Sequence, residues 1–119
     1  MTKRSVTLDL VWQMGAALPG VRKSVSWGSP ALKVKGAGGK LQLMACVPTH
    51  KSAEPGSLLL RMDRRERPAL LEESPELYYV KPHYEDYDAV LVRVGRLTPE
   101  LTRDLLAMAH HFVTSRRRR

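Results

Sequence analysis

The chain has 119 residues, of which 43% are hydrophobic and 27% are charged. These proportions are typical of one soluble globular domain and exclude an intrinsically disordered chain. No apolar run approaches the length of about 18 residues that a transmembrane helix needs, so we expect no membrane partner. The net charge of +8 favours anionic partners. We expect a single domain over residues 1–115 and a flexible arginine tail over 116–119.

The first part of the chain predicts a helix followed by strands. A helix over about 7–18 has Thr7 as its N-cap, apolar residues at helical spacing, and Leu-Pro-Gly at its end. Residues 24–30 have the composition of a connecting turn. Apolar and polar residues then alternate over 31–36 and 40–47, which predicts two half-buried strands.

The remaining elements follow a polar loop at 48–56. Asp63 is a candidate cap for a helix over about 64–73, although Pro68 pushes its regular part later. Thr98 caps the last helix, with Pro99 at its first position. The expected strands of this half are 57–62, 77–80 and 89–94. The order α-β(3)-α-β(2)-α, with short connections, predicts a two-layer α+β domain with an antiparallel sheet.

The segment KVKGAGGK, residues 33–40, contains three glycines and three lysines. Glycine beside lysine is found in phosphate-binding loops, but such a loop has Gly-Lys-Ser/Thr ahead of a helix. Here Lys40 is followed by Leu41 and a predicted strand, so the glycines are better interpreted as the turn of a β-hairpin.

Positive charge is concentrated early in the chain. Residues 1–61 contain 9 lysines and arginines but only two acids, Asp9 and Glu54, whereas 62–115 contain 7 basic and 10 acidic residues. The last four residues are all arginine. We therefore expect an anion-binding surface in the first half of the chain.

Strand alternation assigns each side chain to one face of the sheet. The face towards the helices is expected to carry Leu32, Val34, Leu41, Leu43, Leu58, Leu60, Val90 and Val92. The other face is expected to carry Lys33, Lys35, Gln42, Met44, Leu59, Arg61, Leu91 and Arg93. It is basic at its edges, with an apolar strip formed by Met44, Leu59 and Leu91.

Few residues suggest chemistry beyond binding. Trp27 is interpreted as a packing residue that closes one end of the core, with stacking on a base as the alternative. The segment 81–88 mixes His83 with acids and tyrosines, but a solvated acidic loop explains it better than a metal site. Cys46 is interpreted as a small strand residue in a protein of a reducing compartment, which favours the cytoplasm. We expect no enzyme activity, cofactor or metal.

The segments LPGVRKSVSWGSPALKVKGAGGK and YYVKPHYEDYDAVLVRV resemble the MmcQ/YjbR family of small bacterial proteins. The resemblance covers nearly the whole chain. Trp27, Gly28 and Pro30 match one motif of the family, while Lys33, Gly36 and Lys40 match the strand and turn of a wing. Pro82 and Tyr84 match a second segment. The resemblance implies a secretion-chaperone-like arrangement of the fold and a DNA-binding role through two wing-like protrusions.

We therefore expect a non-enzymatic DNA-binding protein that contacts phosphates through basic hairpin wings. The alternative is a protein-interaction or chaperone-like module, including a homodimer, that uses the apolar strip on the open sheet face. The candidate nucleic-acid-binding residues are Lys33, Lys35, Lys40, Lys51, Arg61 and Arg93.

Overall fold

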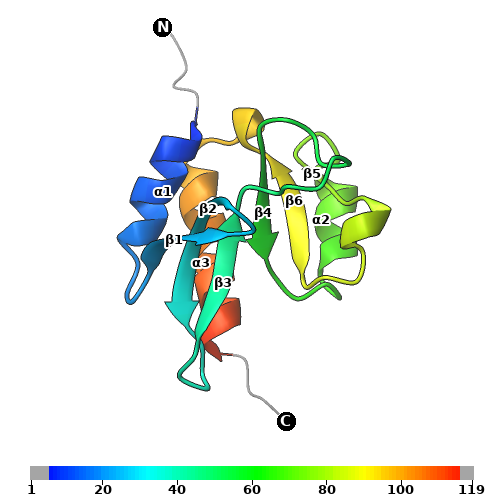
Figure 1. The fold of residues 1–119 in the computed structure, drawn as a ribbon. Helices are drawn as coiled ribbons and strands as arrows, with labels where there is room; N and C mark the ends of the chain where they lie inside the picture. The colour runs from blue at the N-terminus through cyan, green and yellow to red at the C-terminus, as the bar shows by residue number, and fades with distance from the viewer. Residues whose placement is uncertain (1–5, 116–119) are drawn as a thin grey trace, which may run out of the picture.

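The computed structural model describes residues 6–115 and contains a six-stranded antiparallel sheet and three α-helices (Figure 1). The α+β class, the two layers and the antiparallel sheet are as the sequence predicts. The expected tail, residues 116–119, lies outside the described residues. None of the helices in residues 6–115 combines the length and apolar character that a bilayer crossing requires. The helices are α1 (Leu8–Ala16), α2 (Arg67–Glu73) and α3 (Pro99–Ser115), with 3-10 turns η1 (Pro82–Tyr84) and η2 (Val94–Arg96).

The strands lie in the order β1-β2-β3-β4-β6-β5 across the sheet. The sheet has one strand more than expected, because residues 22–26 form the edge strand β1, although 24–26 are expected to belong to a connecting turn. That segment has one apolar residue, Val25, and even this side chain is 59% exposed, so it lacks the alternation that marks a strand. The bounds are β1 (Arg22–Ser26), β2 (Ser29–Lys35), β3 (Leu41–Cys46), β4 (Ser57–Arg61), β5 (Tyr78–Tyr79) and β6 (Ala89–Arg93).

Local capping determines where the helices begin. The Thr7 hydroxyl accepts a hydrogen bond from the backbone N–H of Leu10 at 3.3 Å, and Thr98 accepts from Leu101 at 3.1 Å. Each satisfies an N–H that has no partner within its helix, so these two predicted caps are confirmed. The predicted cap Asp63 is wrong, because the N-cap residue of α2 is Glu66, which forms no side-chain capping bond. The middle helix begins at Arg67 rather than near 64, in keeping with the delay expected from Pro68.

Helices α1 and α3 cover one face of the sheet and build the main core. Leu32, Leu60 and Val92 point towards Val11 of α1 and Leu106 of α3, and all five are nearly inaccessible to solvent. The buried stripe of α3 includes Thr102, Leu105, Leu106, Ala109 and Val113, whereas Leu101, Met108 and Phe112 are only partly buried.

A β-bulge reverses the expected faces of β3. Lys33 pairs with Leu43, but the preceding Leu32 pairs with Ala45, so Met44 is an extra residue in the ladder. Met44 is therefore buried in the helix-side core, while Leu41 and Leu43 lie on the opposite face beside the lysines of β2. The prediction that Met44 is part of an apolar surface strip is wrong.

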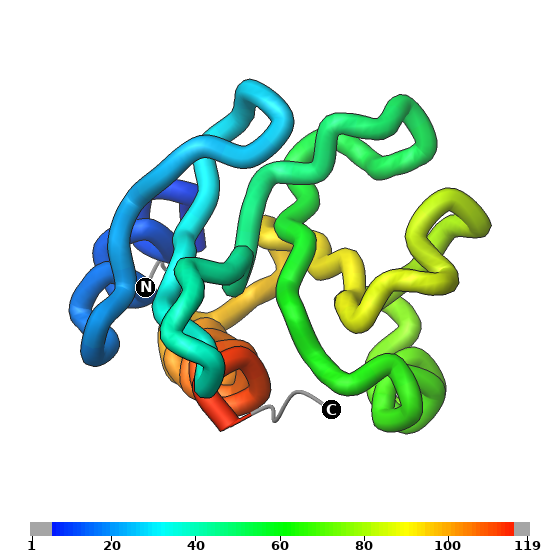
Figure 2. Tube along the Cα trace, turned by 60° about the horizontal axis from the view of Figure 1, so that its bottom comes forward, coloured from blue at the N-terminus to red at the C-terminus, as the bar shows by residue number. Residues whose placement is uncertain are grey.

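The opposite face of the sheet is covered over β4, β5 and β6. A second core contains Cys46, Leu59 and Leu91, and the last two are only 2% and 1% exposed. Their cover comes from the loop between β3 and β4 and from the segment with η1, which contributes Tyr84. Figure 2 shows both segments and the β1–β2 turn rising on the side away from α3. The interpretation of this region as an open apolar face is therefore wrong.

Replacement of Leu59 tests the second core. We expect Leu59→Ala to lower the free energy of unfolding by about 2–5 kcal/mol, because it leaves a cavity beneath the loop. The control Leu41→Ala removes the same atoms from a side chain that is 47% exposed, and should change stability by about 0.5 kcal/mol or less. Urea unfolding measures both. Equal effects of the two substitutions would contradict a covered face.

Candidate nucleic-acid interface

Three basic residues of β1 and β2 lie on one face of the sheet. Lys33 and Lys35 are two positions apart on β2 and therefore point the same way, and Arg22 is paired directly with Lys33 across the ladder. Lys40 follows in the turn, one residue before the partner of Lys35. Within residues 6–115, the ammonium and guanidinium groups of this basic cluster (Arg22, Lys33, Lys35 and Lys40) form no salt bridge. The cluster thus keeps its positive charge available to an external anion.

The β2–β3 turn is a tight hairpin, as the sequence predicts. Gly36 donates its N–H to the Lys40 carbonyl at 2.9 Å, and Gly39 donates to the Gly36 carbonyl at 2.9 Å. Gly39 has a φ of 86°, which a residue with a side chain adopts only at a cost. These bonds fix the position of Lys40 relative to Lys35.

The turn lies against the C-terminal end of α3 (Figure 1). A Cβ placed on Gly36 would be 3.3 Å from the Val113 carbonyl oxygen, so there is little room between the two backbones. Helix α3 ends at Ser115. The four arginines that follow in the sequence lie outside the described residues.

The remaining candidate residues do not join this cluster. Lys51 belongs to the β3–β4 loop. This loop lies at the end of the molecule opposite the β2–β3 turn (Figure 1). Arg61 is half-buried between the diverging strands β3 and β4, where it donates to the carbonyls of Asp88 at 3.0 Å and Leu43 at 3.4 Å. Its guanidinium lies 5.3 Å from the centre of the Phe112 ring. These contacts of Arg61 therefore stabilise the folded structure.

Arg93 is held by an acid from the β3–β4 loop. Both of its contacts to the Glu54 carboxylate, from Nε and from Nη2, are 2.9 Å long, and its guanidinium stacks 4.5 Å from the Tyr79 ring centre. The pair lowers the pKa of Glu54, chiefly through the hydrogen bond from Arg93. Arg93 and Arg61 thus lie apart from the basic cluster, and long-range partners that no local pattern reveals already occupy them.

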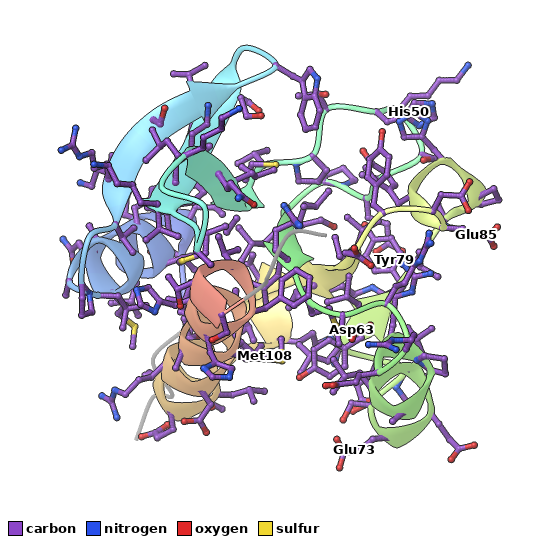
Figure 3. All side chains as sticks on the ribbon, turned by 90° about the horizontal axis from the view of Figure 1, so that it is seen from below. His50, Asp63, Glu73, Tyr79, Glu85 and Met108 are labelled. Atoms are coloured by element: carbon purple, nitrogen blue, oxygen red, sulfur yellow. The ribbon has the colours of Figure 1, made fainter. Side chains whose placement is uncertain are left out.

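Two tyrosine hydroxyls hold the same loop against the sheet. The Tyr79 hydroxyl accepts from the Glu54 N–H at 2.7 Å, and the Tyr84 hydroxyl accepts from the His50 N–H at 3.2 Å. Burial raises the pKa of Tyr84, so this hydroxyl stays protonated over the physiological range. In Figure 3, His50 lies near the η1 segment that carries Glu85.

An aromatic pocket of about 410 Å³ lies between this loop, the η1 segment and the β1–β2 turn. The His50 and His83 rings are stacked, with centres 3.7 Å apart and planes 10° apart. Tyr84 lies edge-on to His83, with a centre-to-centre distance of 4.8 Å, and to Tyr87, with a distance of 5.7 Å. The pocket is lined by Trp27, Pro48, Thr49, His50, Leu59, His83, Tyr84 and Tyr87.

Buried Arg67 fixes the backbone that presents Tyr87. Its guanidinium donates to the carbonyls of Glu85 at 2.8 Å, Tyr87 at 3.1 Å and Ala89 at 2.9 Å. Hydrogen bonds from the buried Arg67 therefore hold the backbone of the segment after η1, and the Tyr87 side chain of this segment lines the pocket. Among the described residues, no group of three histidine, cysteine, aspartate or glutamate side chains is placed to hold a metal ion.

Trp27 does not close the core. It is the first residue of the two-residue turn between β1 and β2, and its side chain is 65% exposed. Its φ of 51° is in the left-handed region, a conformation that costs a bulky residue about 1–3 kcal/mol. Turns of this type favour asparagine or aspartate at the first position and glycine at the second, where Gly28 stands. The packing interpretation of Trp27 is therefore wrong.

No protein-family model and no curated protein sequence matches this chain. Its fold is similar to the crystal structure of Deinococcus radiodurans protein DR2400, which has a DUF419 domain. The two share 22% sequence identity and superpose with a TM-score of 0.67, covering 88% of this chain and 76% of the other. At this identity the likeness concerns the fold.

Titration of Glu54 tests the anchor of the β3–β4 loop. Because the folded-state pKa of Glu54 is lowered, the ion pair stabilises the protein fully above the usual value of 4.5 and is lost as the pH falls through the folded-state value. We expect Glu54→Gln to be less stable than the wild type at pH 7. The urea midpoints of the two proteins should converge in acid.

A matched control is Glu72→Gln, which removes an exposed carboxylate of α2. The urea midpoint of this variant should differ little from that of the wild type at every pH. If the urea midpoint of Glu54→Gln stays below that of the wild type at low pH, the ion pair is not the cause of the difference in stability.

Proposed function

We propose that the protein binds DNA through the basic cluster on β1, β2 and the β2–β3 turn. The observation that carries this proposal is the absence of any salt bridge to the cluster among residues 6–115, although the chain has 12 acids. Phosphates are the dominant source of affinity for a surface of this kind, and they confer no sequence preference.

The acidic half of the chain supports this proposal, because its carboxylates neutralise two of its own arginines, Arg64 and Arg65. Arg65 forms a bidentate pair with Asp63, with contacts of 2.8 to 3.2 Å, and Arg64 lies 3.7 Å from Asp88. The cleft of about 570 Å³ beside α3 is lined by these paired groups, with Asp63 and Met108 on its walls (Figure 3). An anionic polymer would therefore meet its strongest attraction at the basic cluster.

The resemblance to the MmcQ/YjbR family supports the same proposal, since it implies a wing that corresponds to the β2–β3 hairpin. With it we propose a binding role without catalysis, in the cytoplasm of a bacterium. Buried Cys46 is compatible with that location, because burial raises its pKa to about 11 and leaves the thiol unreactive. We do not propose a partner for the Met44, Leu59 and Leu91 strip, since all three side chains are buried.

Charge reversal in the hairpin tests the proposed site. We expect Lys35→Glu with Lys40→Glu to weaken binding to every duplex sequence, and to reduce the slope of log affinity against log salt by about 2. Fluorescence anisotropy of a labelled duplex, measured between about 50 and 200 mM salt, gives both quantities.

A charge-matched control separates the site from the net charge. Arg96→Glu with Arg103→Glu alters exposed residues of η2 and early α3, at the end of the molecule away from the hairpin (Figure 1). This variant should bind almost as well as the wild type. If the two double variants lose equal affinity, the site assignment is incorrect.

A further inference from the structure

Trp27 adopts a strained backbone without the burial that usually offsets such strain. It is the only residue other than glycine with a positive φ in residues 6–115. A large aromatic side chain on a solvent-exposed turn contributes little to the core, and asparagine would suit the turn better. Strain that persists without a packing benefit points to a role for the side chain itself.

The surroundings of Trp27 are suited to a flat aromatic ligand. Its side chain lines the same pocket as the stacked His50 and His83 rings and the partly exposed Tyr87. Buried Leu59 supplies an apolar contribution to the lining. A volume of about 410 Å³ is within the usual range of small-molecule sites.

The position of the pocket connects it to the basic cluster. Trp27 lies at the end of the β1–β2 ladder where Ser26 pairs with Ser29, and the same ladder continues to the pair of Arg22 and Lys33. Lys51 follows His50 directly in the β3–β4 loop. Lys51 therefore places positive charge next to the pocket residue His50, and the basic cluster begins further along the same β1–β2 ladder.

We propose that the pocket takes one unpaired base of a bound nucleic acid, which stacks on Trp27, so that the protein prefers single-stranded DNA. This inference rests on the proposed function and names its substrate class. Every base has a flat π-face, so stacking tolerates any sequence. A base within a duplex is already stacked and paired, and it would have to leave the helix to enter the pocket.

The composition of the pocket argues against a cationic ligand. Aromatic cages also bind quaternary ammonium groups. However, none of the eight residues that line this pocket is acidic, and the neighbouring Lys51 would repel a cation. Asp86, an acid that follows η1 in the chain, is paired with Arg64 at 3.9 Å, so its charge is already partly neutralised.

The test uses the full chain with Trp12 replaced by phenylalanine, which makes Trp27 the only tryptophan. A short oligothymidylate should quench its fluorescence saturably, and should bind more tightly than a duplex of the same length. Trp27→Asn should weaken single-strand binding by about 5- to 100-fold, as expected for loss of one stacked base. Duplex binding and the salt slope should not change.

Trp27→Asn also controls for folding, because asparagine suits the left-handed turn and should keep or raise the unfolding temperature. Trp27→Phe should recover part of the single-strand affinity. Equal affinity of Trp27→Asn and the parent for the oligothymidylate overturns the inference, and so does quenching by tetramethylammonium but not by the oligonucleotide. In either case duplex binding that depends on Lys35 and Lys40 leaves the proposed function intact. Absence of binding to both single strand and duplex overturns the inference and the proposed function together.

Discussion

The anchoring of the β3–β4 loop is the interaction on which the rest of the structure depends. The Glu54 carboxylate of this loop pairs with Arg93 of β6. The Tyr79 hydroxyl accepts a hydrogen bond from the backbone N–H of Glu54. The loop then covers Leu59 and Leu91, which would otherwise form an apolar surface. It also places His50 against His83. One ion pair and two tyrosine hydroxyls, those of Tyr79 and Tyr84, thus convert a sheet with an exposed face into a covered core with an aromatic pocket at its rim.

The distribution of charge follows from the same contacts. Three of the acids after residue 62, Asp63, Asp86 and Asp88, pair with Arg64 or Arg65. Of the two acids before it, Glu54 pairs with Arg93. The lysines of β2 and its turn remain without such partners among the described residues. In a protein of net charge +8, the local pairing decides where a positive potential is left to act on a ligand. The proposed surface is therefore defined by where the basic residues lie relative to the acids, and not by the number of basic residues in the chain.

The parts of the fold that depend on neighbouring residues could be predicted from the sequence. The helix caps Thr7 and Thr98, the glycine turn at 36–39 and the two-layer class all follow from local patterns. The β-bulge at Met44 could not be predicted, because residues 43–47 are all apolar and only the pairing with β2 shows the extra residue. Half of the expected site, Lys33, Lys35 and Lys40, lies together, whereas Arg61 and Arg93 have partners far away in the chain. Arg22 was missed because recognising it required β1. For Trp27 the sequence favours packing over base stacking, because an exposed tryptophan in a strained turn contradicts ordinary packing.

The most direct test of the account is an NMR titration of the ¹⁵N-labelled protein with a short single-stranded oligonucleotide at low salt. We expect the largest shifts on the amides of β1, β2 and the β2–β3 turn and on the indole N–H of Trp27, whereas the amides of α1 and η2 should stay unchanged. Shifts concentrated in the cleft between Asp63 and Met108, or no shifts at all, would contradict it.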